Sequence, residues 1–198
     1  MIKLTKNELR DQQFRLMQLQ KYLPTLQLKK AMLQAEVSQA LLEIETLKEA
    51  YLEEKKRSAR FQLLLTDPSS AYLMRGTSVA DVKKRYENIA GIDIPHFENV
   101  VFQPAEYTLF DTPLWLDSAL AKLRHLVIAR EKVLVAREKK ERLEKELREV
   151  SIRVNLFEKV MIPRTQKNIK KIKVFLGDQE LAAIAQAKVA KNKIMQKR

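Results

Sequence analysis

Two long stretches of this sequence carry apolar side chains at alternating spacings of three and four residues. The first stretch has eleven such positions, ten of them apolar: Leu16, Leu19, Leu23, Leu26, Lys30, Leu33, Val37, Ala40, Ile44, Leu47 and Tyr51. A period of 3.5 residues keeps one helix face against a partner helix in a left-handed coiled coil. The pattern predicts a helix over about residues 5–66, with Thr5 and Glu8 capping its first turn and Pro24 bending it.

The second stretch repeats this pattern near the other end of the chain. Its apolar positions are densest at the start and then drift: Leu143, Leu147, Val150, Val154, Phe157, Met161, Thr165, Ile169, Ile172 and Leu176. Thr112 as N-cap and Pro113 at the first helical position predict where this helix begins. We expect Pro163 to bend it and Gly177 to break it, with a weaker helical pattern resuming over residues 181–194.

A helix of about 60 residues, about 90 Å long, cannot bury an apolar stripe on itself. Because the two stretches are similar in length, an antiparallel hairpin pairing residues whose numbers add to roughly 178 is the economical arrangement. This places Pro24 near Val154 and Lys3 near Phe175. The expected fold class is therefore all-α dominated, a long antiparallel two-helix coiled coil. Its helical arms are residues 1–66 and 112–198, and residues 177–198 project as a single-helix tip.

The segment between the arms, residues 67–111, has a different composition and is expected to form a small module. The sequence TDPSS at 66–70 is typical of a helix stop followed by a turn. Ser78 to Tyr86 is interpreted as a short helix, with Ser78 and Asp81 as its cap. Residues 88–102 are rich in β-branched and aromatic side chains, which predicts short strands or a β-hairpin. A module this small is expected to pack on the helices or on another subunit.

The positive charge is concentrated at the two ends of the chain. The formal net charge is +13, with +5 carried by residues 1–30 and +9 by residues 159–198. The remaining residues carry a net charge of −1. In an antiparallel hairpin both basic ends meet at the same end. A basic coiled coil that binds nucleic acid or another polyanion is an alternative, although no DNA-binding motif or aromatic stacking platform accompanies the charge.

The sequence contains no recognisable catalytic, cofactor or metal site. It has no cysteine, and its three glycines, at positions 76, 91 and 177, are too far apart to form either of the glycine-rich phosphate loops. The two histidines, His96 and His125, fall in different expected elements and are interpreted as ordinary surface or packing residues. No apolar run of about 18 residues predicts a membrane helix, and the N-terminus does not have the pattern of a secretory signal.

Three blocks of the sequence resemble the D subunit of the V-type and A-type ATPases, the central rotor shaft. They are the opening block at 4–34, NIAGIDIPHFE at 88–98 and RVNLFEKVMIPRTQKNIKKIKVFL at 153–176. The last block is the most specific, because a generic coiled coil does not need its order of Asn155, Glu158, Pro163 and Arg164. Phe157 stands where leucine is common in the family. The length resembles that of bacterial or archaeal members.

The resemblance implies a non-catalytic shaft that couples ATP hydrolysis or synthesis to proton or sodium translocation through a membrane ring. The nucleotide chemistry would occur between A and B subunits, which surround the coiled coil as a hexamer. The F subunit and a funnel-shaped membrane-side subunit would meet its far end. The resemblance further implies a peripheral position on the cytoplasmic side, indirect membrane contact, no nucleic acid, no cofactor and no homo-oligomer within the complex.

Two sets of residues are candidates for partner contacts. The first faces the A and B subunits in this interpretation, with a merely solvated surface as the alternative: Arg10, Arg15, Arg164, Lys167, Lys170 and Lys171. The second would dock a small partner subunit, with a simple cap over the hairpin bend as the alternative: Ile89, Ile92, Ile94, Val100 and Phe102. A free-standing scaffold coiled coil would leave NIAGIDIP and RVNLFEKVMIPR unexplained.

Overall fold

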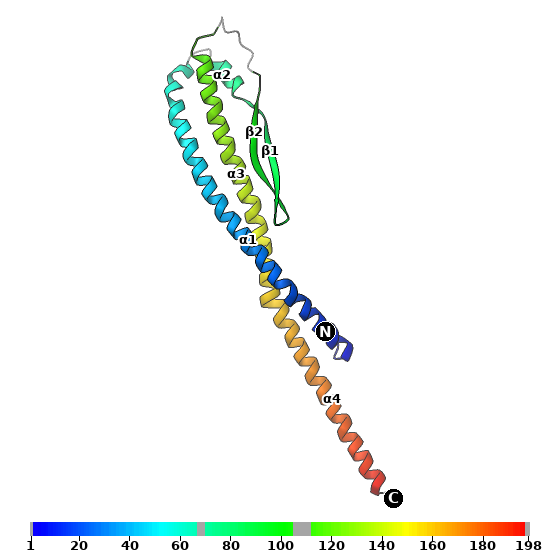
Figure 1. Ribbon diagram of the computed structural model, residues 1–198. Helices are drawn as coiled ribbons and strands as arrows, with labels where there is room; N and C mark the ends of the chain where they lie inside the picture. The colour runs from blue at the N-terminus through cyan, green and yellow to red at the C-terminus, as the bar shows by residue number, and fades with distance from the viewer. Residues whose placement is uncertain (1, 67–69, 105–111, 197–198) are drawn as a thin grey trace. The chain divides into compact units, whose positions relative to one another are not determined.

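The computed structural model describes residues 2–66, 70–104 and 112–196. Two long helical segments pack antiparallel, and a short helix and a two-stranded hairpin lie between them in the sequence (Figure 1). The elements, in chain order, are α1 (Lys6–Ser58), the 3₁₀ helix η1 (Ala59–Thr66), α2 (Ser70–Gly76), β1 (Val79–Ile89), β2 (Ile92–Phe102), α3 (Leu116–Leu156), the π-helical turn η2 (Phe157–Met161) and α4 (Ile162–Gln196). This confirms the predicted fold class.

The chain forms two compact units, each built from both long helical segments. The terminal unit consists of Met1–Lys30 and Glu149–Arg198, and the central unit consists of Ala31–Arg148. All positions of both predicted apolar series are buried or half-buried within these units. Leu33, Leu143 and Ile172 are completely buried. The 3.5-residue period therefore predicted the packed face of each helix correctly.

Contacts between the long segments give the antiparallel register within each unit. In the terminal unit, Asn168 Nδ2 donates to Gln12 Oε1 at 3.4 Å, and Lys6 Nζ lies 3.6 Å from a Glu180 carboxylate oxygen. In the central unit, Lys139 Nζ lies 3.0 Å from Glu43 Oε2. Asn168, Lys139 and Glu180 lie two, four and eight residues C-terminal to the partners in the predicted register. The predicted pairing is confirmed with this offset.

Helix α1 begins as the capping signal predicts and continues through Pro24. The Glu8 backbone N–H donates to Thr5 Oγ1 at 3.3 Å, which satisfies one of the free donors of the first turn. Pro24 lies inside the uninterrupted helix Lys6–Ser58. The 3₁₀ helix η1 follows this helix to Thr66, where the predicted segment ends. The predicted turn at 66–70 falls largely on residues 67–69, which lie outside the described residues.

The second long segment departs from the prediction at two points. Helix α3 begins at Leu116, so the predicted start at Thr112 and Pro113 is wrong. A turn precedes it, in which the Leu116 N–H donates to Pro113 O at 3.0 Å. Pro163 lies in the first turn of α4, directly after the π-helical turn η2. The predicted break at Gly177 is also wrong, because a glycine costs a helix interior only about 1 kcal/mol and α4 continues to Gln196.

The predicted short helix at Ser78–Tyr86 is also wrong. Most of these residues belong to β1, and the short helix α2 lies upstream at Ser70–Gly76. Strand β1 pairs antiparallel with β2 along its length, from Val79 opposite Phe102 to Ile89 opposite Ile92. A ladder of hydrogen bonds along both strands, interrupted by two register shifts, outweighs the local capping signal of Ser78 and Asp81.

A two-residue turn closes the hairpin between β1 and β2. Both turn residues have positive φ, 53° at Ala90 and 83° at Gly91. This is the combination required by the type I′ turn, whose twist matches that of the paired strands. The Asn88 side-chain oxygen accepts the Gly91 N–H at 3.1 Å and supports the turn. The hairpin predicted within 88–102 is confirmed, although its first strand begins earlier, at Val79.

A small apolar core holds α2 against α3 in the central unit. Leu73 of α2 is buried against three residues of α3, and two half-buried residues pack at the edge: Leu116, Ala119, Leu120, Trp115 and Leu123. Arg124 extends this contact, because its Nε donates to the carbonyl of Gly76 at 2.9 Å. Helix α2, which leads into β1, is thereby fixed to the start of α3.

Candidate partner-contact surfaces

The terminal unit brings together cations from the two ends of the sequence. Arg15 of α1 and Arg164 of α4 line the same groove, together with Gln12, Val160 and Asn168. Arg10 lines a second groove of this unit, beside Lys173 and Glu180. The sequence predicted that Arg10 and Arg15 lie opposite the cations of α4. The first groove pairs Arg15 with Arg164, and the second pairs Arg10 with Lys173, so each groove is lined by cations from both helices.

All six predicted head-contact residues are exposed: Arg10, Arg15, Arg164, Lys167, Lys170 and Lys171. Arg164, Lys167 and Lys171 follow at three- and four-residue steps, which places them on one side of α4. Among the described residues, none of the six forms an ion pair. Lys6, by contrast, reaches Glu180 across the unit. We refer to these six residues as the cation set, and their charges are available to an external carboxylate.

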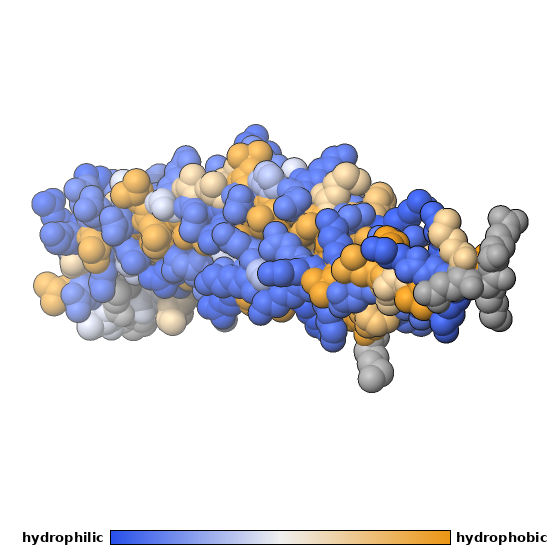
Figure 2. Space-filling model, turned by 90° about the horizontal axis from the view of Figure 1, so that it is seen from below, coloured by the Kyte–Doolittle hydropathy of each residue, from blue (hydrophilic) through white to orange (hydrophobic). Residues whose placement is uncertain are grey.

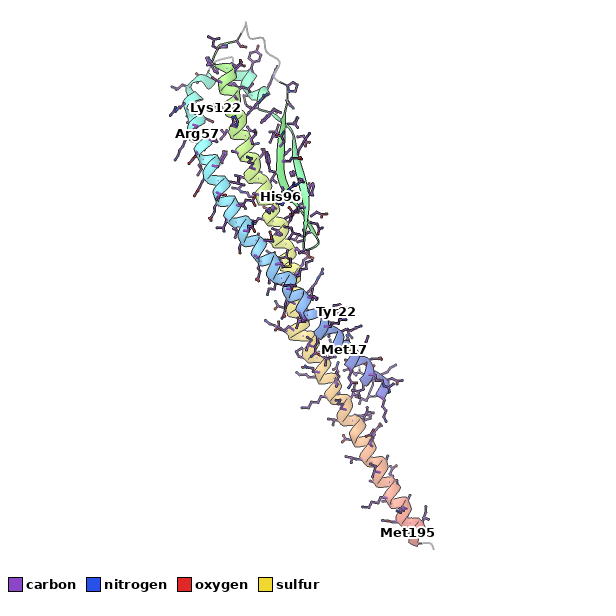
Figure 3. All side chains as sticks on the ribbon, viewed as in Figure 1. Met17, Tyr22, Arg57, His96, Lys122 and Met195 are labelled. Carbon is purple, nitrogen blue, oxygen red and sulfur yellow. The ribbon has the colours of Figure 1, made fainter. Side chains whose placement is uncertain are left out.

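Exposed apolar side chains accompany the cation set. Met17 and Tyr22 project from α1 (Figure 3), and both are more than half exposed. Val160 of η2 lines the groove beside Arg164 and is also exposed. Further along α4, every side chain from residue 178 to residue 195 is exposed. In the face seen in Figure 2, hydrophobic side chains lie scattered among more numerous hydrophilic ones.

The hairpin residues predicted to dock a partner divide into two groups. Ile94 and Val100 are only 0% and 5% exposed, so they pack inside the central unit and are covered in this conformation. Ile89, Ile92 and Phe102 are half-buried. The exposed large apolar side chains of the described strands are instead Tyr86 and Val101.

Three cation–aromatic pairs, which the sequence did not predict, join the hairpin to α3. Arg124 lies 5.1 Å from the centroid of the Phe102 ring, Lys132 lies 5.6 Å from that of Phe97, and Arg142 lies 5.7 Å from that of Tyr86. At these distances the ring face attracts the cation. Aromatic residues in the strands and basic residues off the leucine seam were visible in the sequence, but their pairing was not. Figure 1 shows β1 and β2 running beside α3.

A charged clamp reinforces this contact between the hairpin and α3. Lys84 of β1 lies 2.6 Å from Glu138 Oε2, and Arg142 lies 2.7 Å from Glu138 Oε1. Arg142 also donates to the backbone carbonyl of Asp93 in β2 at 3.1 Å. The hydrogen bond from Lys84 is the main cause that lowers the pKa of the Glu138 carboxyl, with Arg142 adding to it and partial burial opposing it. One carboxylate thus links α3 to both strands through its two cations.

The comparisons with known proteins agree with this architecture. The family model described as the D subunit of ATP synthase matches residues 8–192. The D subunit of the V-type ATP synthase of Chlamydia felis is 43% identical over 198 residues, covering 100% of this chain and 95% of the relative. That of Chlamydia pneumoniae is 42% identical over 194 residues, covering 98% and 93%. The chain belongs to the family of ATP synthase D subunits. This is the family of a non-catalytic central-stalk subunit of rotary ATPases.

Among the described residues, no group of three or more histidine, cysteine, aspartate or glutamate side chains is placed to hold a metal ion. Within the same part of the chain, no helix has both the length and the apolarity needed to cross a membrane.

The Glu138 clamp predicts a specific acid sensitivity of this family member. Because its folded-state pKa is lowered, its stabilising contribution is complete above the ordinary glutamate pKa of about 4.3 and disappears as the pH falls through the folded-state value. Glu138→Gln is expected to lower the free energy of unfolding at pH 7 by about 0.5–1 kcal/mol. Because glutamine does not titrate, the free energy of unfolding of the variant should fall less below about pH 4 than that of the unaltered chain. Urea titrations across this acid range and up to neutral pH measure both effects. The exposed Glu141→Gln variant is the control, and an equal acid response in both variants would contradict the assignment.

Proposed function

We propose that this chain is the rotating shaft that couples ATP hydrolysis or synthesis in an A/B hexamer to ion translocation through a membrane ring. The observation that carries the proposal is the family match across residues 8–192. The terminal unit supports it, because the cation set lies exposed on paired helices and has no ion-pair partner among the described residues.

A shaft that passes through several equivalent positions needs contacts that break and re-form. Exposed ion pairs contribute only about 0–1 kcal/mol each, so a carboxylate on A or B can release one arginine or lysine without a deep energetic trap. A buried apolar contact would contribute about 25 cal/mol per Å² and would favour one position. We infer that the cation set is the main surface of the shaft that contacts the A/B hexamer, the head of the complex. We also infer that residues 177–198 form the single-helix tip of the shaft.

The central unit supplies the proposed docking surface for the F subunit or the funnel-shaped membrane-side subunit. The module within residues 67–111 presents Ile89 and Ile92 on either side of its turn, both half-buried. Exposed Tyr86 and Val101 extend the available apolar surface. Since Ile94 and Val100 are buried, we propose docking through the other side chains.

Co-expression with the A, B, F and funnel subunits tests this function. Affinity capture through a tag on the A subunits is expected to recover this chain in the complex. Omitting the chain is expected to remove the F and funnel subunits while leaving an A/B assembly. Native mass spectrometry measures the composition. An intact complex that excludes this chain would contradict the proposal, and preferential capture by nucleic acid at physiological salt would favour the polyanion-binding alternative.

A double variant, Ile89→Lys with Ile92→Lys, separates the docking surface from the head contact. Both side chains are partly exposed beside the turn, so the charges reach solvent without entering the core. We expect the variant to join A and B but to lose the F subunit or the funnel subunit. A control with Lys83→Gln on the exposed part of β1 is expected to keep every partner. Full recovery of both partners by the double variant would remove the docking assignment and leave the shaft proposal standing.

A further inference from the structure

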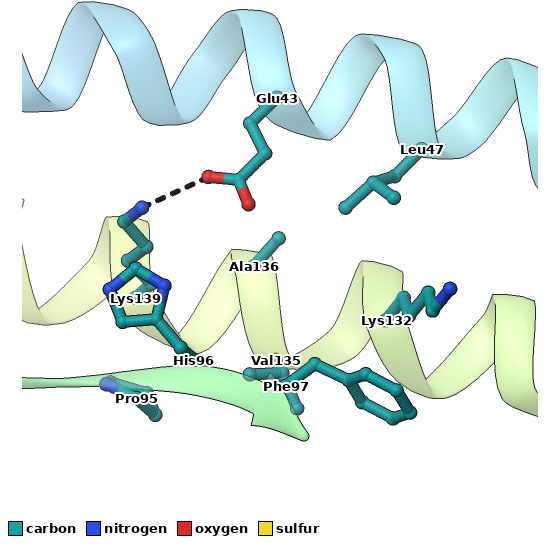
Figure 4. A pocket seen from close by; sticks show the side chains of 9 residues that line it. All are labelled: Glu43, Leu47, Pro95, His96, Phe97, Lys132, Val135, Ala136 and Lys139. Atoms are coloured by element: carbon teal, nitrogen blue, oxygen red, sulfur yellow. Dashed lines mark hydrogen bonds and ion pairs between the residues drawn. The ribbon is translucent and has the colours of Figure 1, made fainter. Parts of the chain in front are cut away.

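The central unit contains a pocket that the proposed shaft function does not use. It has a volume of about 260 Å³ and lies where α1, β2 and α3 meet (Figure 4). Four ionisable side chains line it: Glu43, His96, Lys132 and Lys139. The rest of the lining is apolar and consists of Leu47, Pro95, Phe97, Val135 and Ala136. A hollow with apolar walls and a few converging polar groups has the usual character of a small-molecule site.

One end of the pocket holds hydrogen-bonding capacity that the described residues do not use. The Lys139 side chain is only 8% exposed, and its ammonium group has one acceptor, Glu43 Oε2 at 3.0 Å. An ammonium group has three donors, so two remain without an acceptor among the described residues. Nε2 of His96 is enclosed and has no hydrogen-bond partner, although a carboxylate oxygen of Glu87 lies 3.4 Å away. Buried polar groups of this kind are normally satisfied by a ligand or by water.

The other end of the pocket is predominantly apolar. In Figure 4, Leu47 and Phe97 lie at the opposite end from His96 and Lys139, with Val135 and Ala136 between. Lys132 stands at this end with its ammonium group 5.6 Å from the centroid of the Phe97 ring. The lining therefore has a polar end at His96 and Lys139 and a largely apolar end, where Lys132 is the one charged side chain.

The charge of the lining favours an anion. Lys132 and Lys139 are positive, and Glu43 is the one carboxylate among the lining residues, so the lining is net positive even with neutral His96. One Glu43 oxygen accepts from Lys139, and the two further donors of the Lys139 ammonium group remain for a ligand. A ligand with acceptor oxygens at one end would satisfy these donors, and charge-assisted hydrogen bonds of this kind are among the stronger ones.

We propose that this pocket binds a small organic anion, with its carboxylate or phosphate head at Lys139 and His96 and an apolar body against Leu47, Val135 and Ala136. Binding would join α1, β2 and α3 through one molecule. It would stabilise the docked hairpin, because a ligand that binds only the folded state raises its stability. The site uses no residue of the cation set.

Calorimetric titration of the full chain with benzoate tests the proposal, since benzoate combines an anionic head with an apolar body. We expect saturable binding at one site. Inorganic phosphate supplies the charge without the body, and benzyl alcohol supplies the body without the charge. Both are expected to bind at least tenfold more weakly than benzoate at matched ionic strength. If all three bind equally, or if none saturates, the proposal is wrong.

Two variants locate the binding. Lys139→Met keeps the apolar stem but removes the charge, and it is expected to weaken benzoate binding at least tenfold. Ala136→Leu keeps every charge but fills the hollow, and it is expected to abolish binding. Lys140→Met, a neighbour on α3 that pairs with Glu144, is the matched control and should bind as the unaltered chain does.

Circular dichroism shows whether each variant keeps its helices. If Lys139→Met loses helicity, Ala136→Leu alone decides the question. If Ala136→Leu also loses helicity, chemical-shift changes at His96 in the unaltered chain decide it. Retained binding in folded Ala136→Leu, or a His96 signal that does not move with benzoate, would overturn the proposal.

Discussion

Leu143→Ala is expected to lower the free energy of unfolding of this chain by about 2–5 kcal/mol. Leu143 belongs to the apolar seam of α3 and is 0% exposed. Truncation removes buried methyl groups and leaves a cavity that the two paired helices can fill only partly by moving closer together. Urea denaturation followed by circular dichroism measures the loss, which should appear mainly as a lower midpoint with little change in slope.

A matched leucine on the outer face of α1 provides the control for this prediction. Leu42 is 64% exposed, so Leu42→Ala is expected to change the free energy of unfolding by no more than about 0.5 kcal/mol. Equal effects of the two substitutions would show that the seam residues do not carry the helix pairing, and the coiled-coil interpretation would fail.

Neutralising four cations of α4 together is expected to reduce coupled turnover of the assembled complex severalfold, while the chain stays folded. The substitutions are Arg164→Gln, Lys167→Gln, Lys170→Gln and Lys171→Gln, all at exposed positions. Each ion pair with the head would contribute only about 0–1 kcal/mol, so Arg164→Gln alone should have a modest effect. Single-molecule rotation under load, compared with ATP hydrolysis by the same preparation, measures the loss of torque.

The matched control neutralises four exposed cations of the central unit: Lys48→Gln, Lys55→Gln, Lys56→Gln and Lys145→Gln. It changes the net charge by the same amount and is expected to retain normal torque. Wild-type torque in the α4 variant would show that these side chains form only a solvated surface. Equal losses in both variants would point to total charge instead of the proposed head contact.

The helix seams and the antiparallel pairing could be predicted because they depend on periodicity. Leu33 in α1 and Leu143 in α3 each belong to a series whose spacing places its members on one face of their own helix. Thr5 likewise caps α1 through a donor three residues away. The exposed cation set was also foreseeable, since arginine and lysine on the polar side of an amphipathic helix remain in water.

Local signals misled the prediction where distant partners decide the structure. Ser78 and Asp81 have the spacing of a helix cap, yet this segment becomes β1 because β2 supplies a ladder of hydrogen bonds. Gly177 does not end α4, because its local cost is small beside the continuous helix on either side. The burial of Ile94 and Val100, two of the docking candidates, likewise depends on packing within the central unit.

By itself, the sequence determined which faces of the long helices are buried, that the helices pair antiparallel, and which family the chain resembles. These properties follow from periodic spacing and from motifs that are local in the chain. Only the tertiary structure decided how the hairpin meets α3. The Lys84–Glu138 pair joins residues 54 positions apart, and Lys139 meets Glu43 across 96 positions. Such contacts depend on how separate elements pack, and no local spacing encodes them.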